Sequence, residues 1–250
     1  MAVGTDPSVR PDIPEEGLVL YVKKASPTST ANSVKPLMMI EALNIPHHIH
    51  IINSTSNETW FHAVNPYKMV PALEDTVVDP DTGAPKRVRV FDSSACLAYL
   101  VDRYDKSGLY GGRDICERTE INNWLFSYTA GLGATGKTWL LMKMPKDVDI
   151  GESLSVLLRY IRNEYDFLET RLKEPGQDFI AVADRPTVAD FAILPLANDT
   201  IAKSADLDFN AWPHLKAWSE RVAALEPVAA AMHRIARFGL SEEELKSLES

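Results

Sequence analysis

The segment NPYKMVPALED, residues 65–75, lies at the centre of the fold that this sequence predicts. Its second half, VPALED, is a strand candidate that follows a turn containing Asn and Pro. Outward from it, three more apolar segments have the length of strands: LVLYVK (18–23), HHIHII (47–52) and VRVF (88–91). Helical spacing is found instead in ANSVKPLMMIEALN (31–44), ETWFHAVN (58–65) and SSACLAYLVDRYD (93–105). The order β-α-β-α-β-β-α predicts a small α/β domain.

The second half of the chain has a different character, because almost every segment from about Ile115 onward has helical spacing. The clearest patterns are ERTEINNWLFSYTA (117–130), SLSVLLRYIRNEYDFLETRL (153–172), RPTVADFAILPLAND (185–199) and PHLKAWSERVAALEPVAAAMHRIARF (213–238). Thr187 and Asp190 have the spacing of a capping box at a helix start. Pro36, in the first half, is expected near the first turn of its helix, where a missing N–H costs little. We expect an all-helical second domain and a solvated acidic tail.

The segment GLGATGKT, residues 131–138, fits two phosphate-binding patterns, G-x-G-x-x-G and G-x-x-x-x-G-K-T. Both patterns work only where a buried strand enters the loop and a helix leaves it. The residues before Gly131 have helical spacing, so we interpret the glycines as positions that loosen or bend a helix, at about 1 kcal/mol each relative to Ala. Glycines at such positions often allow close approach of a ligand or of another backbone.

The bulk composition indicates a globular protein: of its 250 residues 45% are hydrophobic and 24% charged, and the formal net charge is -9. That charge argues against nucleic acid and anionic membranes as partners. No apolar run reaches the roughly 20 residues of a membrane span, and the first residues lack the apolar core of a secretory signal. The two cysteines, Cys96 and Cys116, form no disulfide framework, so we expect a cytoplasmic protein. His47, His48 and His50 lack partners at metal spacing, and we expect no metal.

Several segments resemble the glutathione transferases, above all NPYKMVPAL, FDSSACLAYL and RPTVADFAILPL. Further segments resemble the fungal transferases of gliotoxin-type (epipolythiodioxopiperazine) pathways: YVKKASPTSTANSVKP, YDKSGLYGGR, INNW and KEPGQDFIAVADRPTVAD. The resemblance covers about residues 18–236. It implies the glutathione transferase fold, an α/β thioredoxin-like N-terminal domain followed by an all-α domain. The expected parts are an extended lead-in (1–17), the glutathione-binding domain (18–106), a linker (107–114), the helical domain (115–238) and the acidic tail (239–250).

The resemblance also implies how the first domain binds glutathione. It implies a cis bond between Val70 and Pro71, which turns the Val70 N–H and C=O toward the cysteinyl backbone of glutathione, as one strand edge meets another. Ser93, at a helix start, is implied to hold the γ-glutamyl carboxylate and Asp92 to face the ammonium group. Plain N-capping by the same two residues is the alternative. Lys68 is implied to bind the glycyl carboxylate, one residue earlier than in many relatives. The alternatives are a solvated lysine and a contact supplied instead by the loop containing Trp60 and His62.

The thiol of glutathione needs activation, because a thiol with a pKa of about 8.5 is mostly protonated at neutral pH. The start of the first helix, directly after LVLYVK, offers hydrogen-bond donors and positive potential. The polar residues in that region are Ser26, Thr28, Ser29, Thr30, Asn32 and Ser33. The resemblance points to Ser29 and Asn32 as the catalytic residues. Helix capping by the whole cluster is the alternative.

The acceptor side of the site is implied to involve Lys137, within GLGATGKT, which could stabilise a developing oxyanion or a leaving hydroxyl group. Trp139, Met142 and Tyr128 are candidates for an apolar wall, with a place in the helical core as the alternative. Tyr21 lies inside a strand and is a poor candidate for activating a thiol.

Taken with the resemblance, the sequence predicts an enzyme that joins glutathione to an electrophilic carbon of an oxidised diketopiperazine and so forms a carbon–sulfur bond. Glutathione is a co-substrate, the acceptor is a hydrophobic small molecule, and no metal or redox cofactor is implied. The family is usually dimeric, so a homodimer is expected. The alternatives are a non-catalytic glutathione-binding protein of the same fold, a general detoxifying transferase, and glutathione-dependent isomerisation or peroxide reduction.

Overall fold

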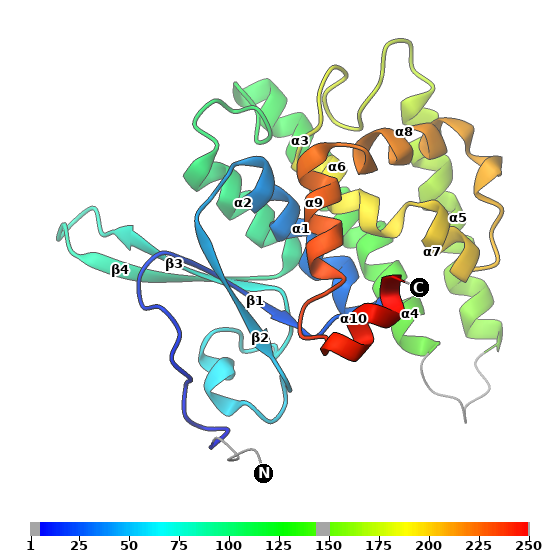
Figure 1. The fold of residues 1–250 in the computed structure, drawn as a ribbon. Helices are drawn as coiled ribbons and strands as arrows, with labels where there is room; N and C mark the ends of the chain where they lie inside the picture. The colour runs from blue at the N-terminus through cyan, green and yellow to red at the C-terminus, as the bar shows by residue number, and fades with distance from the viewer. Residues whose placement is uncertain (1–5, 144–150, 250) are drawn as a thin grey trace. The chain divides into compact units, whose positions relative to one another are not determined.

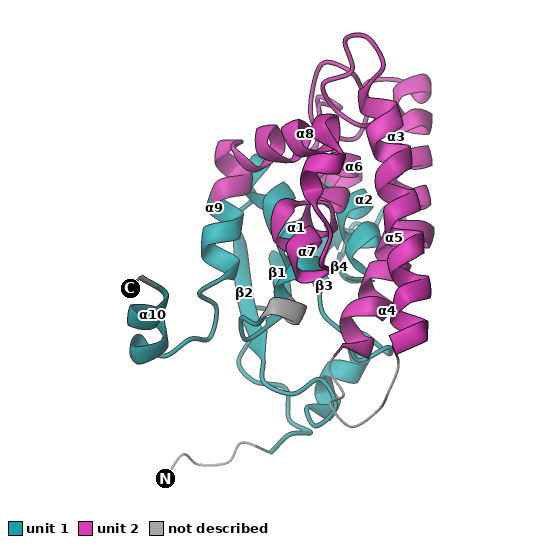
Figure 2. Cartoon of the chain, turned by 90° about the vertical axis from the view of Figure 1, so that its right-hand side faces the viewer, with its two compact units in different colours: residues 1–100, 230–250 teal, residues 101–229 magenta. Residues whose placement is uncertain are grey.

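The computed structural model describes residues 6–143 and 151–249, apart from the side chains of residues 27–29 and 249 (Figure 1). The chain divides into two compact units, which Figure 2 shows in different colours. Unit 1 comprises Met1–Leu100 together with Ala230–Ser250, and unit 2 comprises Val101–Ala229. The end of the chain is therefore grouped with its first half, which differs from the boundaries expected at 107–114 and 239.

Unit 1 is built on a four-stranded mixed sheet. Its strands are β1 (Leu18–Lys23), β2 (His47–Ile52), β3 (Ala72–Val78) and β4 (Pro85–Phe91). They lie in the order β2-β1-β3-β4, with β1 and β2 parallel and β3 antiparallel to both β1 and β4. Leu20 in β1 is opposite Leu73 in β3, which is in turn opposite Val90 in β4. The predicted strands are all present, and the α/β prediction is confirmed.

The helices of unit 1 are α1 (Pro27–Ala42), the 3-10 helix η1 (Thr59–Ala63), α2 (Ser93–Tyr104), α9 (Glu226–Ile235) and α10 (Glu242–Glu249), of which α2 and α9 continue across the boundary with unit 2. Helix α1 packs on β1. Its central residues Leu37, Met38 and Met39 are fully buried. Because α1 begins at Pro27, the expectation for Pro36 is wrong: this proline lies inside the helix and removes one of its backbone hydrogen bonds.

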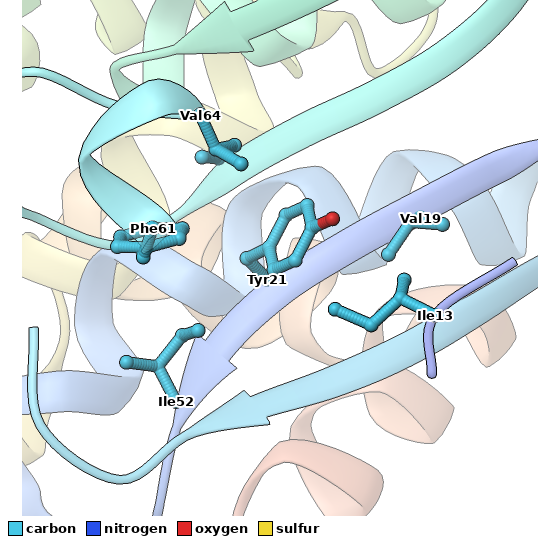
Figure 3. Close-up of a cluster of buried hydrophobic side chains, with 7 residues drawn as sticks. Ile13, Val19, Tyr21, Ile52, Phe61 and Val64 are labelled. Carbon is cyan, nitrogen blue, oxygen red and sulfur yellow. The ribbon is translucent and has the colours of Figure 1, made fainter. Parts of the chain in front are cut away.

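A cluster of buried side chains lies on one face of the sheet (Figure 3). Val19 and Tyr21 of β1 point to the same face, because alternate side chains of a strand do so. They pack in one cluster with Phe61 and Val64 from the η1 region and with Ile13 from the lead-in. The predicted lead-in is therefore anchored at Ile13, where only 4% of the residue is exposed.

A network around the buried carboxylate of Glu74, in β3, also ties the lead-in to the sheet. Arg10 Nη2 and the Tyr21 hydroxyl each donate to Glu74 Oε2 at 2.6 Å. Arg89 Nε donates to Glu74 Oε1 at 3.1 Å. Burial raises the pKa of Glu74, but the hydrogen bonds from Arg10 and Tyr21 outweigh it and lower this pKa to about 2. The carboxylate is thus charged at neutral pH and joins three parts of unit 1.

Unit 2 is helical in the part that the structure describes. Its elements are α3 (Ile115–Tyr128), the π-helix η2 (Thr129–Gly133), α4 (Ala134–Met142), α5 (Gly151–Leu172), α6 (Val188–Ile193), the 3-10 helix η3 (Leu194–Leu196), α7 (Asp199–Ser204), the 3-10 helix η4 (Phe209–Ala211) and α8 (Pro213–Ala223). The predicted capping box is confirmed, because Asp190 Oδ2 accepts from the Thr187 N–H at 2.8 Å while the Thr187 side chain caps α6. None of the helices described here is long and apolar enough to cross a membrane.

The segment GLGATGKT lies within one helical stretch, from α3 through η2 into α4. No strand leads into it, so the structure excludes the phosphate-loop interpretation. The π-helical turn confirms that the glycines loosen a helix, and such turns are frequent at functional sites. A Cβ on Gly131 would lie 2.5 Å from Glu164 Oε1, so a larger residue there would require the Glu164 side chain to move.

The acidic tail, 239–250, is mostly exposed in its described residues, as expected, but it also forms a helix and makes contacts. Glu242–Glu249 form α10, and Glu244 Oε1 lies 2.7 Å from Lys24 Nζ, just after β1. The Ala25 N–H donates to the Phe238 carbonyl at 2.8 Å. These contacts attach the end of the chain to the loop that enters α1.

Candidate active site

The start of α1 is the expected thiol-activating region, and the structure gives it a defined backbone. Thr30 N–H donates to the Ser26 carbonyl at 3.2 Å, and Thr30 Oγ1 donates to the same oxygen at 3.0 Å. Ser29 lies in this first turn, but its side chain is outside the described part of the structure. The roles expected for Thr28 and Ser29 side chains therefore stay predictions.

Asn32 is half-buried and one turn further along α1. Its Oδ1 accepts a 2.7 Å hydrogen bond from Lys35 Nζ. Lys35 is 1% exposed, which makes it one of the largest fully buried side chains of the chain. Burial lowers the pKa of Lys35 to about 7, and the charge of Asp92 opposes this shift. Lys35, which the sequence analysis did not single out, is thus hydrogen-bonded to one predicted site residue, Asn32, and is affected by the charge of another, Asp92.

The loop before β3 is shaped by Asn65, which is 2% exposed. Its Nδ2 donates to the Met69 carbonyl at 2.7 Å, and its Oδ1 accepts from the Tyr67 N–H at 2.9 Å. The peptide bond between Val70 and Pro71 is cis, as the resemblance implies. Val70 packs against the core cluster of the sheet. Asn65 therefore fixes the loop that carries the Val70 main chain, a task that sequence reasoning did not assign to it.

Lys68 lies in the same loop, with an exposed side chain and a φ of 56°. Its N–H donates to the Asn65 carbonyl at 3.0 Å and closes a turn. Few residues other than glycine adopt this left-handed conformation without cost. The left-handed conformation of Lys68 sets the direction of the chain between Asn65 and Val70. The contact expected between Lys68 and the glycyl carboxylate stays a prediction.

Asp92 and Ser93 stand at the start of α2. Asp92 Oδ1 accepts from the Ser94 N–H at 2.8 Å and from the Ala95 N–H at 3.3 Å. N-capping, the alternative stated above, is therefore present for Asp92. Asp92 has a φ of 76° and is exposed, while Ser93 is 8% exposed. A capped helix start still presents free N–H groups to an anion, so the capping and binding roles are compatible.

A cavity of about 420 Å³ lies beside the start of α1, within unit 1. It is lined by Ala25, Ser26, Thr30, Ala236, Leu240, Glu244, Ser247 and Leu248. The α1 side of this cavity carries hydroxyl groups, and the C-terminal side is mainly apolar apart from Glu244 and Ser247. Glu244, one of the lining residues, pairs with Lys24 at 2.7 Å. The cavity places apolar surface next to the region expected to hold the glutathione sulfur.

Lys137, the remaining predicted catalytic residue, belongs to unit 2. It lies half-buried in α4. Trp139 and Tyr128 are 2% and 4% exposed, which places both of them in the helical core. A separate cavity of about 350 Å³ in unit 2 is lined by Trp124, Ser127, Tyr128, Leu132, Glu164, Phe167, Leu168 and Ile193. Lys137 is not one of the residues that line it.

Tyr21 and the two cysteines, which the sequence analysis set aside as thiol-activating residues or disulfide partners, can also be assigned from the structure. Tyr21 is buried and donates to Glu74, and burial raises its pKa further above the ordinary value. It belongs to the core of the sheet, as expected. Cys96 is buried in α2, where burial raises the pKa of its thiol, and Cys116 is exposed. A buried neutral thiol is a poor nucleophile.

Two family models match the chain: glutathione S-transferase, N-terminal domain, at residues 31–103, and glutathione S-transferase, C-terminal domain, at residues 134–226. The glutathione S-transferase tcpG of Claviceps purpurea is 52% identical over 247 residues, which cover 98% of each chain. This chain therefore belongs to the glutathione transferase family, and it is an enzyme of that family.

Two further relatives extend the comparison. The trimodular acetylaranotin synthesis protein ataIMG of Aspergillus terreus is 35% identical over 205 residues, covering 82% of this chain and 20% of that protein. A glutathione transferase homologue from Lodderomyces elongisporus, solved with two glutathione molecules per subunit, has a TM-score of 0.74 at 23% identity. The match covers 88% of this chain and 99% of that structure. It confirms the transferase fold predicted from the sequence.

Proposed function

We propose that this transferase joins the sulfur of glutathione to an electrophilic carbon of an oxidised diketopiperazine. The observation that carries the proposal is the grouping within unit 1 of Asn32 and Lys35, in the first half of α1, with Asp92, before α2. The 420 Å³ cavity lies beside the start of the same helix α1. Relatives support it from two directions: one is named for acetylaranotin synthesis, and a structural neighbour was solved with glutathione. The likeness to gliotoxin-type transferases indicates the acceptor class.

Glutathione binds along the loop before β3 and the start of α2 in this proposal. The Val70 main chain pairs with the cysteinyl backbone, next to the cis bond to Pro71. The α2 start binds the γ-glutamyl carboxylate through N–H groups and the Ser93 hydroxyl, because a helix start favours anions. Asp92 Oδ2 faces the ammonium group while Oδ1 keeps its capping bonds. Lys68 binds the glycyl carboxylate as an exposed point charge.

The start of α1 keeps the sulfur ionised. Ser29 donates its hydroxyl hydrogen to the thiolate, and Asn32 donates from its amide nitrogen. The positive end of the helix adds favourable potential, and both effects lower the pKa of the thiol. Only the thiolate attacks well, so this pKa determines the reactive fraction of bound glutathione.

The chemical step follows from an acceptor with a hydroxyl group on the carbon next to a ring nitrogen. Loss of this hydroxyl group together with the amide proton gives an N-acyl imine and one water molecule. The thiolate adds to the imine carbon and forms the carbon–sulfur bond, while the nitrogen regains a proton. The balance is glutathione plus hydroxylated acceptor giving conjugate plus water. The role expected for Lys137, in unit 2, as a donor to the departing hydroxyl group stays a prediction.

The acceptor binds in the apolar part of the cavity beside α1, against Leu240 and Leu248. We also propose that the enzyme works as a homodimer in the cytosol and needs no metal. Glutathione is the co-substrate, and it is consumed in the reaction.

The proposal is tested by incubating the enzyme with glutathione and a panel of electrophiles. The panel contains a hydroxylated diketopiperazine, its deoxy analogue and two general detoxification substrates, an aryl halide and an enal. Mass spectrometry is expected to show the diketopiperazine conjugate, formed with loss of water, and none from the deoxy analogue. Efficient turnover of the aryl halide or the enal without the diketopiperazine conjugate would identify a general detoxifying transferase instead.

A further inference from the structure

Lys35 is unusual because a lysine is almost never fully buried unless it is paired. It is 1% exposed in the middle of a helix whose neighbouring residues Leu37 and Met38 are apolar and fully buried. Its Nζ donates to Asn32 Oδ1 at 2.7 Å. The carboxylate of Asp92, before α2, acts on it electrostatically. Lys35 is therefore a buried ionisable group that contacts Asn32 and is affected by the charge of Asp92. Both residues belong to the candidate site, so the question is what Lys35 contributes there.

The hydrogen bond from Lys35 fixes how the Asn32 amide is oriented. An ammonium group only donates, so it must face the amide oxygen, and the two N–H groups of Nδ2 then point away from Lys35. Those are the groups that a thiolate requires. Without Lys35, rotation of the amide by a half turn would present its oxygen to the sulfur, and two negative atoms would repel.

The backbone around Asn32 makes this side-chain contact more important. A residue at position 36 of a regular helix would donate its N–H to the carbonyl of Asn32, but Pro36 has no N–H. This turn of α1 therefore has one backbone bond fewer than an ordinary helix. The bond between Lys35 and Asn32 links the side chains of the same turn.

We propose that Lys35 is a positioning residue for the thiolate site, which holds the Asn32 amide with its N–H groups toward the sulfur and places positive charge behind it. This inference rests on the proposed function, in which Asn32 donates to the sulfur of glutathione. Lys35 does not touch glutathione itself; it acts through Asn32.

The electrostatic surroundings fit this role. Burial lowers the pKa of Lys35 to about 7, and Asp92 favours the charged form. On α2, the Cys96 thiol stays neutral because burial raises its pKa. A protonated Lys35 polarises the amide and strengthens its donation to an anion. Deprotonation near neutral pH removes that charge, so the activity profile is expected to carry the titration of Lys35.

The test uses the full-length enzyme with Lys35→Met, which removes the donor and the charge at nearly constant volume, and Lys35→Arg, which keeps the charge. Lys86→Met, at a lysine with a 63% exposed side chain, is the matched control. The ultraviolet absorbance of the thiolate is titrated in each enzyme–glutathione complex, with S-methylglutathione as the blank. Circular dichroism checks folding, and kcat and KM for glutathione are measured across pH.

Lys35→Met is expected to raise the pKa of bound glutathione by about one unit, which lowers the thiolate fraction and kcat about tenfold below that pKa. KM for glutathione is expected to change less than about twofold, since Val70 and Ser93 remain. Lys35→Arg is expected to recover part of the loss, and Lys86→Met to behave as the wild type. A folded Lys35→Met enzyme with an unchanged thiol pKa and pH profile would overturn the inference.

If Lys35→Met does not fold, Asn32→Asp provides the second test. This change keeps the partner of Lys35 but replaces the amide donor by an acceptor, so the bound thiol is expected to lose its low pKa. A low thiol pKa in folded Asn32→Asp would also overturn the inference. Failure of the proposed function is seen separately, as wild-type enzyme that neither binds glutathione in calorimetry nor forms a conjugate.

Discussion

Two buried ionisable side chains, Lys35 in unit 1 and Asp190 in unit 2, are held in different ways. Asp190 accepts from the Ile180 N–H at 2.9 Å, from Trp218 Nε1 at 2.8 Å and from both the N–H and the hydroxyl of Thr187. Its donors come from three separate segments of unit 2. Lys35 instead donates to Asn32, on its own helix and at the edge of the candidate site. On this difference we base the proposal that Asp190 stabilises its unit whereas Lys35 acts on the thiolate site.

The largest stability effect is expected for Asp190→Ala. It leaves the Ile180 N–H and the Trp218 N–H buried without acceptors, so the free energy of unfolding should fall by about 3–5 kcal/mol. Denaturant unfolding of both proteins measures this change in the free energy of unfolding. Asp199→Ala is the control, because Asp199 is half-exposed and pairs with the exposed Lys203, and it should cost less than about 1 kcal/mol. Equal losses of stability in the two variants would contradict the structural role assigned to Asp190.

A large effect on activity, with little effect on stability, is expected for Ser29→Ala. Losing one donor to a developing or resting anion typically lowers kcat about 10²-fold, while glutathione affinity changes little. Steady-state kinetics and calorimetry on the same preparation separate the two quantities. Unchanged kcat would transfer the role to Asn32 or to a neighbouring hydroxyl group such as Thr30.

An intermediate loss of stability is expected for Glu74, whose buried carboxylate holds the lead-in against the sheet. Glu74→Gln should lower the free energy of unfolding by about 2 kcal/mol at pH 7, because hydrogen bonds to a charged group are lost. The pKa of Glu74 in the folded state is about 2, below its ordinary value. This stabilisation is therefore present above the unfolded pKa and is lost as pH falls toward 2. Unfolding curves of both proteins between pH 7 and pH 2 should converge; a constant gap would contradict the assigned pKa.

The smallest effect is expected at the contact between Lys24 and Glu244. Both side chains are about half-exposed, so Lys24→Ala should cost less than about 1 kcal/mol of stability. Because Glu244 lines the cavity beside α1, KM for the acceptor should rise a few-fold while KM for glutathione stays constant. Kinetics with each substrate varied in turn measure this. A rise in KM for glutathione alone would place the acceptor elsewhere.

The strands and most helices could be predicted from sequence because their patterns are local. Period-two and helical spacing identified β1, β2 and α2, and a capping pair identified the start of α6. The start of α1 was missed because its first residues, Pro27 to Thr30, are polar and carry no apolar spacing. Helix α10 was missed because its segment is mainly acidic, and its contacts with the loop before α1 bridge more than 200 positions of sequence.

The resemblance predicted the residues expected to contact a ligand. It did not predict the buried residues that position them. Lys35 and Asn65 were overlooked because burial and partners depend on tertiary structure. One signal was available: Lys35 is the one charged residue in VKPLMMI, an otherwise apolar stretch that predicts burial on every side. Anchoring of the lead-in by Arg10 had no such local signal, since its partner Glu74 is 64 positions away.

The central claim is that the start of α1 ionises the thiol of bound glutathione. An ultraviolet titration of the wild-type complex with glutathione, set against S-methylglutathione, tests it most directly. The account predicts a bound thiol pKa at least about one unit below the ordinary value of about 8.5. A bound thiol that titrates at the pKa of free glutathione would contradict the account, whatever the acceptor.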